Sequence, residues 1–184
     1  WIYQKFWTPI DSFEKGRKSM FNKNKYGYIC GIKASEEQIE FSSDIALRNI
    51  GEYLDSYIEK YPEEVDGPAY GIVVHYYLAK YIDKLIDGSI PYERKDRRIF
   101  RLIWEHKRVM YERIVCIEKE LGLNHCISEK YENIVKESNN IRMLYASYNM
   151  RRRDAILLTI KNKLLALYES EKNLLTLLIK IAKE

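Results

Sequence analysis

The sequence contains no apolar stretch of about 18 residues, the length that a membrane-spanning helix needs, and no basic-then-apolar signal peptide at its start. These absences predict a protein that neither crosses a membrane nor is secreted, and we expect it in the cytoplasm. It has only three cysteines, Cys30, Cys116 and Cys126, and no CxxC motif. The cysteines are far apart, which does not suit a zinc ribbon, and odd in number, which does not suit a disulfide framework, so we expect reduced, buried thiols instead.

The chain also lacks the short motifs of several enzyme classes. No histidine follows a glutamate at the Glu-x-x-His spacing of ferritin-like di-iron sites, and HExxH, P-loop, GxGxxG and GxSxG motifs are absent. His125 and Cys126 are neighbours in a predicted loop, which is not a metal signature. A nucleophilic pair of Cys116 or Cys126 with His75 or His106 needs a proximity that sequence does not define. We predict no metal and no cofactor, and leave open whether the chain is an enzyme.

Tyrosine and an uneven distribution of charge distinguish the composition. The chain has 16 Tyr against 5 Phe and 3 Trp, and tyrosine suits half-buried helix flanks and interfaces. The net charge is +4, yet residues 36–66 carry ten acidic and two basic side chains, whereas residues 1–35 carry two acidic and seven basic. This pattern fits pairing within the chain, or a surface dipole that orients a charged partner.

Apolar residues at helical spacing dominate from Ser42 onward. We predict a mainly α fold, an antiparallel bundle of four to five helices in residues 42–184, preceded by a short extended or strand-like segment. That segment, residues 1–41, could be the tail of a preceding domain. The expected helices cover about 42–61, 68–87, 96–121, 128–149 and 151–182, with Ser42 or Ser43 capping the first and Ser128 the fourth. Residues 149–153 form a weak junction, so the last two helices could be one kinked helix.

Two of these helices carry a polar residue within an apolar stripe. In the third, Ile99, Ile103, Met110, Ile114, Ile117 and Leu121 share one face, and His106 fills the slot seven residues after Ile99. In the fifth, Glu171 interrupts the series Leu157, Leu164 and Leu178. Burying either group unpaired would cost roughly 2–7 kcal/mol. We hypothesise that His106 contacts Glu171, with a tyrosine hydroxyl as the alternative partner, and we add Glu105 and His75 to the buried polar candidates.

Basic residues gather in two places. Arg94, Lys95, Arg97, Arg98 and Arg101 form the densest cluster, at the start of the third helix, and Arg151–Arg153 form another. Positive charge at a helix N-terminus opposes the helix dipole, so local helix stability does not explain the first cluster. It is either a solvated surface or a binding site for an anionic partner. With a net charge of only +4, generic nucleic-acid binding is unattractive.

The run KDRRIFRLIWEHKRVMYERI and the later run from SEKYENIVKESNN to LLALYESEKNLL resemble part of a known family. The family comprises cysteine-peptidase-like proteins found beside bacterial nonribosomal-peptide clusters, similar to the acyltransferase of butirosin biosynthesis. The resemblance covers residues 42–184, the family's helical C-terminal half, and rests on helix pattern and the Trp104–His106 and Ser138–Asn140 stretches. A papain-like N-terminal half supplies the family's nucleophile, and no position here matches that motif.

The resemblance implies a role in bacterial secondary metabolism. The family's acyl donor rides on a carrier protein, typically acidic, so the cluster from Arg94 to Arg101 would be a docking patch. We therefore expect a helical accessory domain of a biosynthetic acyltransferase or cysteine-peptidase-like protein. The alternatives are a non-enzymatic, Tyr-rich interaction module, which could be a homo-oligomer, and an anion or nucleic-acid binder.

Overall fold

The structure is a computed structural model that describes residues 41–55, 70–123 and 127–183, within the compact unit Phe41–Glu184. These residues form five α helices: α2 (Ser43–Asp55), α3 (Val74–Ile86), α4 (Ile99–Leu121), α5 (Ile127–Arg151) and α6 (Asp154–Ile181). Two 3₁₀ turns, η1 (Gly71–Val73) and η2 (Tyr92–Arg94), precede α3 and α4. The expected strand-like segment, residues 56–61 of the first predicted helix, Cys30, His125 and Cys126 lie outside the described residues.

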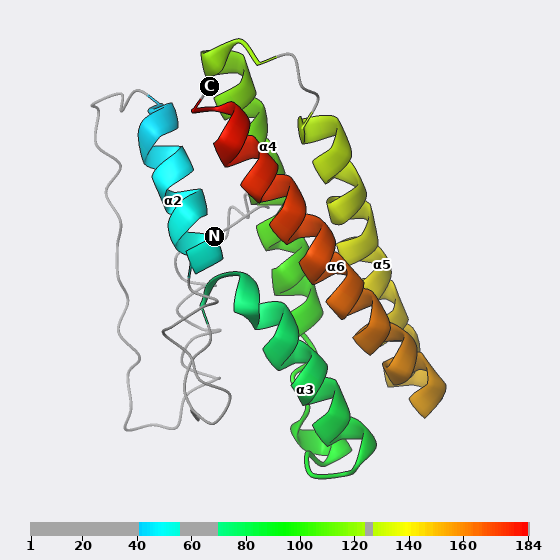
Figure 1. The fold of residues 1–184 in the computed structure, drawn as a ribbon. Helices are drawn as coiled ribbons and strands as arrows, with labels where there is room; N and C mark the ends of the chain where they lie inside the picture. Colours follow the sequence, from blue (N-terminus) through cyan, green and yellow to red (C-terminus); the bar gives the residue numbers. More distant parts are fainter. Residues whose placement is uncertain (1–40, 56–69, 124–126, 184) are drawn as a thin grey trace, which may run out of the picture. The chain divides into compact units, whose positions relative to one another are not determined.

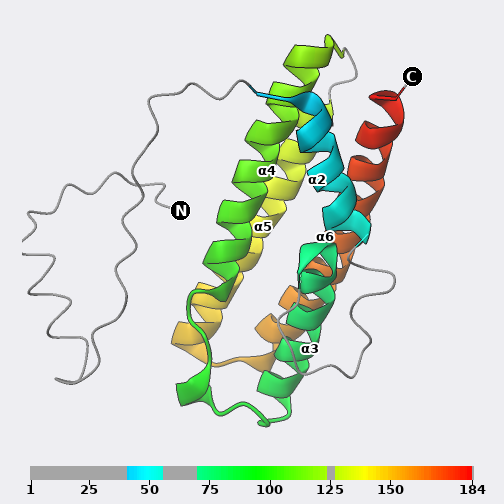
Figure 2. The same ribbon diagram turned by 90° about the vertical axis from the view of Figure 1, so that its left-hand side faces the viewer.

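The fold is mainly α and packs as a helical bundle, which confirms the predicted class (Figure 1). Helix α4 packs along α5, α5 along α6, and α6 along α3, while α2 lies against both α4 and α6. Helices α2 and α3 follow each other on one side of the bundle (Figure 2). The last two helices are separate, because α5 ends at Arg151 and Arg152 adopts a left-handed conformation with φ 51°. None of the helices in the described part of the chain is long and apolar enough to cross a membrane.

The helix ends show which local predictions were right. Ser42 caps α2, because its Oγ accepts the Ile45 N–H at 3.4 Å. Gly122 ends α4 in the left-handed region, φ 61°, as expected of a C-cap glycine. Ser128 is not the cap of α5. The Glu118 carboxylate from α4 accepts the Ile127 N–H at 2.6 Å and the Ser128 N–H at 3.1 Å, and also the Ser128 hydroxyl.

Glu118 therefore satisfies two of the open N–H groups of α5 and places a negative charge at the positive end of its dipole. We expect Glu118→Ala to lower the free energy of unfolding by about 1–2 kcal/mol. Urea denaturation followed by circular dichroism would measure the loss. Glu112→Ala, at an exposed position of the same helix, is the control and should change it by less than about 0.5 kcal/mol. Equal effects of the two substitutions would refute the cap.

The buried residues of α6 match the predicted apolar stripe, whereas on α4 the buried face differs from the predicted one. On α6, Leu157, Leu164, Glu171 and Leu178 are all buried, as the seven-residue series predicts. On α4, the buried residues are Phe100, Lys107, Met110, Ile114 and Ile117. The polar residue in the α4 stripe is therefore Lys107, seven residues after Phe100, and not His106. Helix α3, expected at the centre, packs mainly against α6.

Candidate functional site

Five polar side chains, one from each α helix, meet in the interior of the bundle. We call this set the polar cluster: Tyr53 from α2, His75 from α3, Lys107 from α4, Tyr131 from α5 and Glu171 from α6. His75, Tyr131 and Glu171 are fully buried, and 1% of Lys107 is exposed. Residues this polar are rarely buried unless they are paired, so the cluster is the feature of the core that most needs explanation.

An ion pair between Lys107 and Glu171 forms the centre of the polar cluster. Lys107 Nζ lies 2.6 Å from Glu171 Oε2 and 2.9 Å from Oε1, so the ammonium bridges both carboxylate oxygens. The third ammonium proton points to Tyr53 Oη at 2.9 Å. All three Lys107 donors therefore have acceptors, which is the condition under which a buried charge is tolerated.

Two tyrosine hydroxyls complete the environment of the carboxylate. Tyr131 donates to Glu171 Oε1, and Tyr53 donates to Oε2 at 3.2 Å. Since an ionised carboxylate can only accept hydrogen bonds, these two donors and the ammonium fit a charged Glu171. Burial raises the pKa of both tyrosines, and the carboxylate adds to this rise, so both hydroxyls keep their protons.

His75 borders the polar cluster as a neutral ring. Its Nδ1 lies 2.9 Å from the Ile72 carbonyl oxygen, which can only accept, so Nδ1 carries the proton. Nε2 then holds a lone pair, 3.4 Å from Glu171 Oε2. Burial lowers the pKa of His75 to about 4, the Lys107 charge lowers it as well, and the Glu171 charge opposes them. The ring is therefore uncharged at neutral pH.

The contacts around the Lys107–Glu171 pair also determine the pKa values of the two side chains. Burial by itself would raise the pKa of Glu171, but the Lys107 charge, the charge that His75 carries when it is protonated in acid, and hydrogen bonds from Lys107 and Tyr131 outweigh it and lower that pKa to about 2. Burial lowers the pKa of Lys107, and Glu171 opposes that effect. At neutral pH the polar cluster thus holds one negative and one positive charge.

This arrangement fits a structural role better than a catalytic one. Substrates reach a catalytic group through a cleft, and the charged atoms of the polar cluster are buried among five helices. The groove described below is lined by α5 and α6 and includes none of the five residues. In the described part of the chain, no three His, Cys, Asp or Glu side chains converge as metal ligands would.

The sequence-based site candidates fall in different places. Glu171 and His75 are buried in the polar cluster. The prediction for His106 was wrong: it is exposed on α4, with its ring stacked on Tyr53 at a centroid distance of 5.5 Å. Glu105 is half-buried and forms an ion pair of 2.8 Å with Arg101, one helical turn away.

The hypothesised His106–Glu171 contact therefore does not form; Lys107, the next residue, takes that place. Cys116 is free but exposed, contrary to the expected burial, and lies ten residues from His106 on the same helix. Since an α helix rises about 1.5 Å per residue, the two are about 15 Å apart along the axis and cannot form a nucleophilic pair.

Sequence reasoning missed Lys107, although a signal was present. Phe100, Lys107 and Ile114 repeat at intervals of seven, and the two apolar members are both buried. Starting the stripe at Ile99 moved the polar slot by one residue and selected His106. Tyr53 and Tyr131 were placed on inner faces, but nothing in the sequence identified Glu171 as their acceptor.

The fold brings the two basic clusters to the same end of the bundle. Because α4 and α5 run antiparallel, the start of α4 lies beside the end of α5 (Figure 2). Tyr145 Oη donates to the Asp96 carbonyl at 3.0 Å, and Tyr92 Oη donates to the Asn149 carbonyl at 2.6 Å. We call this surface the arginine end: Arg94, Arg97, Arg98, Arg101, Arg151, Arg152 and Arg153, all of them exposed.

Several of these charges have no acidic partner within the fold. Arg98 is 3.8 Å from Asp96, and Arg101 pairs with Glu105. Ion pairs within the described residues involve none of the other five arginines, although Arg152 stacks over the Tyr92 ring at 4.0 Å. The arginine end is therefore a surface of positive charge that the bundle itself only partly neutralises.

Lys95 does not belong to that surface, which corrects its prediction as a binding residue. Only 5% of it is exposed, and its Nζ lies 2.8 Å from the centroid of the Tyr92 ring and 5.2 Å from that of Tyr148. The ammonium is held against aromatic faces by cation–π attraction. It contributes to packing at this end and is not available to a partner.

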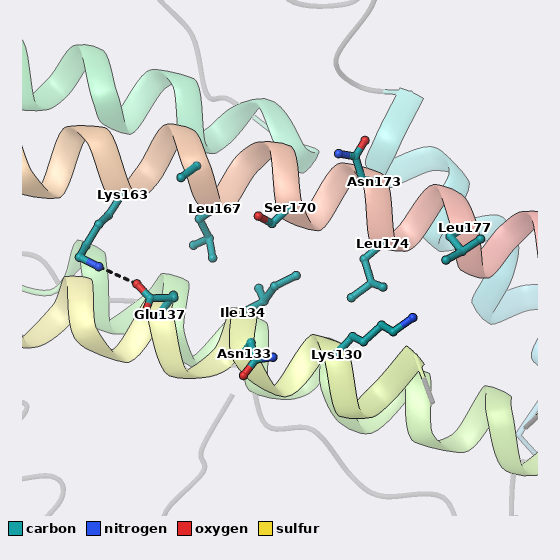
Figure 3. Close-up of a pocket in the computed structure, with 11 residues that line it drawn as sticks. Lys130, Asn133, Ile134, Glu137, Lys163, Leu167, Ser170, Asn173, Leu174 and Leu177 are labelled. Atoms are coloured by element: carbon teal, nitrogen blue, oxygen red, sulfur yellow. Dashed lines mark hydrogen bonds and ion pairs between the residues drawn. The ribbon is translucent and has the colours of Figure 1, made fainter. Parts of the chain in front are cut away.

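A groove between α5 and α6 forms a concavity on the surface of the described residues (Figure 3). We call it the α5–α6 groove. It encloses about 510 Å³ and has an apolar floor of Ile134, Leu167, Leu174 and Leu177. Its edges are polar, and the Glu137–Lys163 ion pair of 2.8 Å crosses one end.

Comparison of the chain with protein-family models, curated proteins and solved structures gave no match.

Proposed function

We propose that the helical unit is a docking domain that binds an acidic protein through the arginine end. One observation supports this proposal above the others: two clusters about fifty residues apart in sequence are brought together by the fold. If the arginines at the start of α4 served only to keep that helix in contact with water, there would be no reason for a second arginine cluster to lie beside them. Clustered, incompletely neutralised arginines steer and hold anionic partners.

We further propose that the partner is an acidic carrier protein, and that the unit is the accessory domain of a biosynthetic acyltransferase or cysteine-peptidase-like protein. This part of the proposal is supported by the sequence resemblance and by the charge of the arginine end.

The test is a binding titration with an acidic holo acyl-carrier protein as the probe. We expect the full chain to bind it, and the variant Arg97→Glu/Arg98→Glu to weaken binding at least about tenfold, since like charges at an interface oppose association. Arg151→Glu/Arg153→Glu should weaken it to a similar degree. Calorimetry at two salt concentrations would measure both effects.

A matched control separates local from global charge. Lys119→Glu/Lys180→Glu makes the same change in net charge at exposed positions near the opposite ends of α4 and α6. It should alter the affinity by less than about threefold. Unchanged carrier binding after charge reversal at Arg97 and Arg98 would refute the proposal. So would single-stranded RNA that binds more tightly than the carrier protein and with a steep dependence on salt.

A further inference from the structure

The α5–α6 groove is separate from both the polar cluster and the arginine end. Its α5 side comes from residues 130–137, in the first half of that helix, whereas the arginine end includes the last residue of α5. Leu177 in its floor is 38% exposed, and Leu174 is half-buried. An inference about the groove therefore does not depend on the proposed carrier binding.

The shape of the groove favours a helix over a small ligand. A small-molecule site usually buries 70–90% of its ligand, whereas this groove is open to solvent, with Asn133, Ser170 and Asn173 exposed along it. From Lys163 to Leu177 it spans about 21 Å of α6, which matches about 14 residues of a second helix. Recognition of an amphipathic helix uses an apolar floor of this kind with polar edges.

The charge of the groove indicates which helix would fit. Lys163 is already paired with Glu137, so its charge is neutralised at that end. Lys130 lies toward the other end and forms no ion pair within the described residues (Figure 3). One uncompensated positive charge beside an apolar floor complements a carboxylate on the occupant.

We propose that the α5–α6 groove binds an acidic amphipathic helix of a partner protein. Leucine-like side chains of the partner, three and four residues apart, would cover Leu167, Leu174 and Leu177, and a glutamate or aspartate would pair with Lys130. Ala166 and Ser170, one turn apart on α6, leave room for the partner's backbone to approach.

The experiment uses the full chain and fluorescent synthetic peptides of about 14 residues. One peptide has leucines at helical spacing and glutamates at its edges, a second has lysines in place of the glutamates, and a third has serines in place of the leucines. We expect the first to bind most tightly. Lys130→Glu should lower the affinity for the acidic peptide and raise the affinity for the basic peptide, each by about two- to fivefold.

A matched pair of variants keeps the result independent of folding. Ser170→Arg places a large side chain in the groove from an exposed position and should lower the affinity for the acidic peptide at least about tenfold. Thr176→Arg adds the same side chain at an exposed position of α6 outside the groove and should change nothing.

Three results would overturn the proposal. They are equal binding of the acidic and serine peptides, binding that survives Ser170→Arg, and a dimer of the chain that Ser170→Arg dissociates in sedimentation. The last would make a second copy the occupant. If the peptides do not bind the groove but the carrier protein still binds, the proposal for the groove is wrong and the proposal for the arginine end stands.

Discussion

Replacing Lys107 with methionine while Glu171 stays in place should destabilise the helical unit by about 3–5 kcal/mol. The carboxylate would remain fully buried and lose the ammonium that bridges both its oxygens. The hydrogen bonds from Tyr53 and Tyr131 would remain, but two neutral donors do not offset the desolvation of an isolated charge. Glu171→Leu should cost a similar amount, because it leaves the Lys107 ammonium buried without its counter-ion.

The double variant Lys107→Met/Glu171→Leu distinguishes an ion pair from two independent residues. With both charges removed, the apolar replacements pack against the core, and a buried pair is often replaced in this way at little cost. We expect the double variant to lose no more stability than either single variant, which corresponds to a coupling of at least about 3 kcal/mol. Urea unfolding followed by circular dichroism at pH 7 would measure all three variants.

Lys136→Met is the control for the loss of a lysine from a helix. Lys136 pairs with Glu132 across one turn of α5, and 63% of its side chain is exposed. Since exposed pairs contribute little, its loss should cost less than about 1 kcal/mol. If Lys107→Met were no worse than Lys136→Met, or if the two single effects simply added, the buried ion pair would be refuted.

Acid should destabilise the unit in two successive pH ranges. His75 is neutral in the folded protein with a pKa of about 4, against about 6.5 in the unfolded chain. Between these values the unfolded chain binds more protons, so the free energy of unfolding falls as pH falls from about 6.5 to 4. A difference of about 2.5 pH units corresponds to a loss of about 3 kcal/mol over that range.

Glu171 acts in the same direction at lower pH. Its pKa is about 2 in the folded protein and near its ordinary value when unfolded, so the stability it contributes is present above about pH 4.5. That stability is lost as pH falls from about 4.5 toward 2. Glu171 and the Tyr168 ring lie beside His75, and the charges of Lys107 and of protonated His106 also interact with it. Of these groups, Glu171 and His106 titrate in the acid range.

His75→Gln separates the two ranges, because glutamine does not titrate. Its free energy of unfolding should fall by about 3 kcal/mol less than that of the wild-type chain between pH 6.5 and 4. The contribution of His106 in this range and the fall below pH 4.5 should remain. His106→Gln should remove that separate contribution, because desolvation of the His106 ring and the Lys107 charge lower the pKa of His106 to about 4 as well. Unfolding curves at intervals of pH would test this, and an unchanged slope in His75→Gln would contradict the assignment of a buried neutral ring.

Helix periodicity was enough to predict the fold class, because burying one face of each helix dominates the packing of a bundle. The α6 series shows this directly: Leu157, Leu164, Glu171 and Leu178 are all buried. The cap of α5 was not predictable in the same way. It is supplied by Glu118 from the preceding helix, which no pattern local to Ser128 reveals.

The candidate site was only partly predictable, for a geometric reason. A polar residue in an apolar stripe indicates that a buried partner exists, but not which residue it is. On α4, an error of one residue rotates the predicted face by about 100°, and this replaced Lys107 with His106. The arginine end was found as two clusters, and their meeting depends on the antiparallel arrangement of α4 and α5.

The polar cluster and the binding surfaces have separate roles in this account. Each α helix contributes one side chain to the polar cluster, and the hydrogen bonds among Tyr53, Lys107, Tyr131 and Glu171 form only when α2, α4, α5 and α6 are all in place. Buried polar groups of this kind favour one arrangement of helices over others. The arginine end and the α5–α6 groove then occupy fixed positions on that framework.

The most direct test of the account is the affinity of the Lys107→Met/Glu171→Leu variant for the holo acyl-carrier protein. If the buried pair supports the fold while the arginine end binds the partner, this variant should bind within about twofold of the wild-type chain. A variant that remains folded by circular dichroism but no longer binds would contradict the account. So would the absence of binding by the wild-type chain itself.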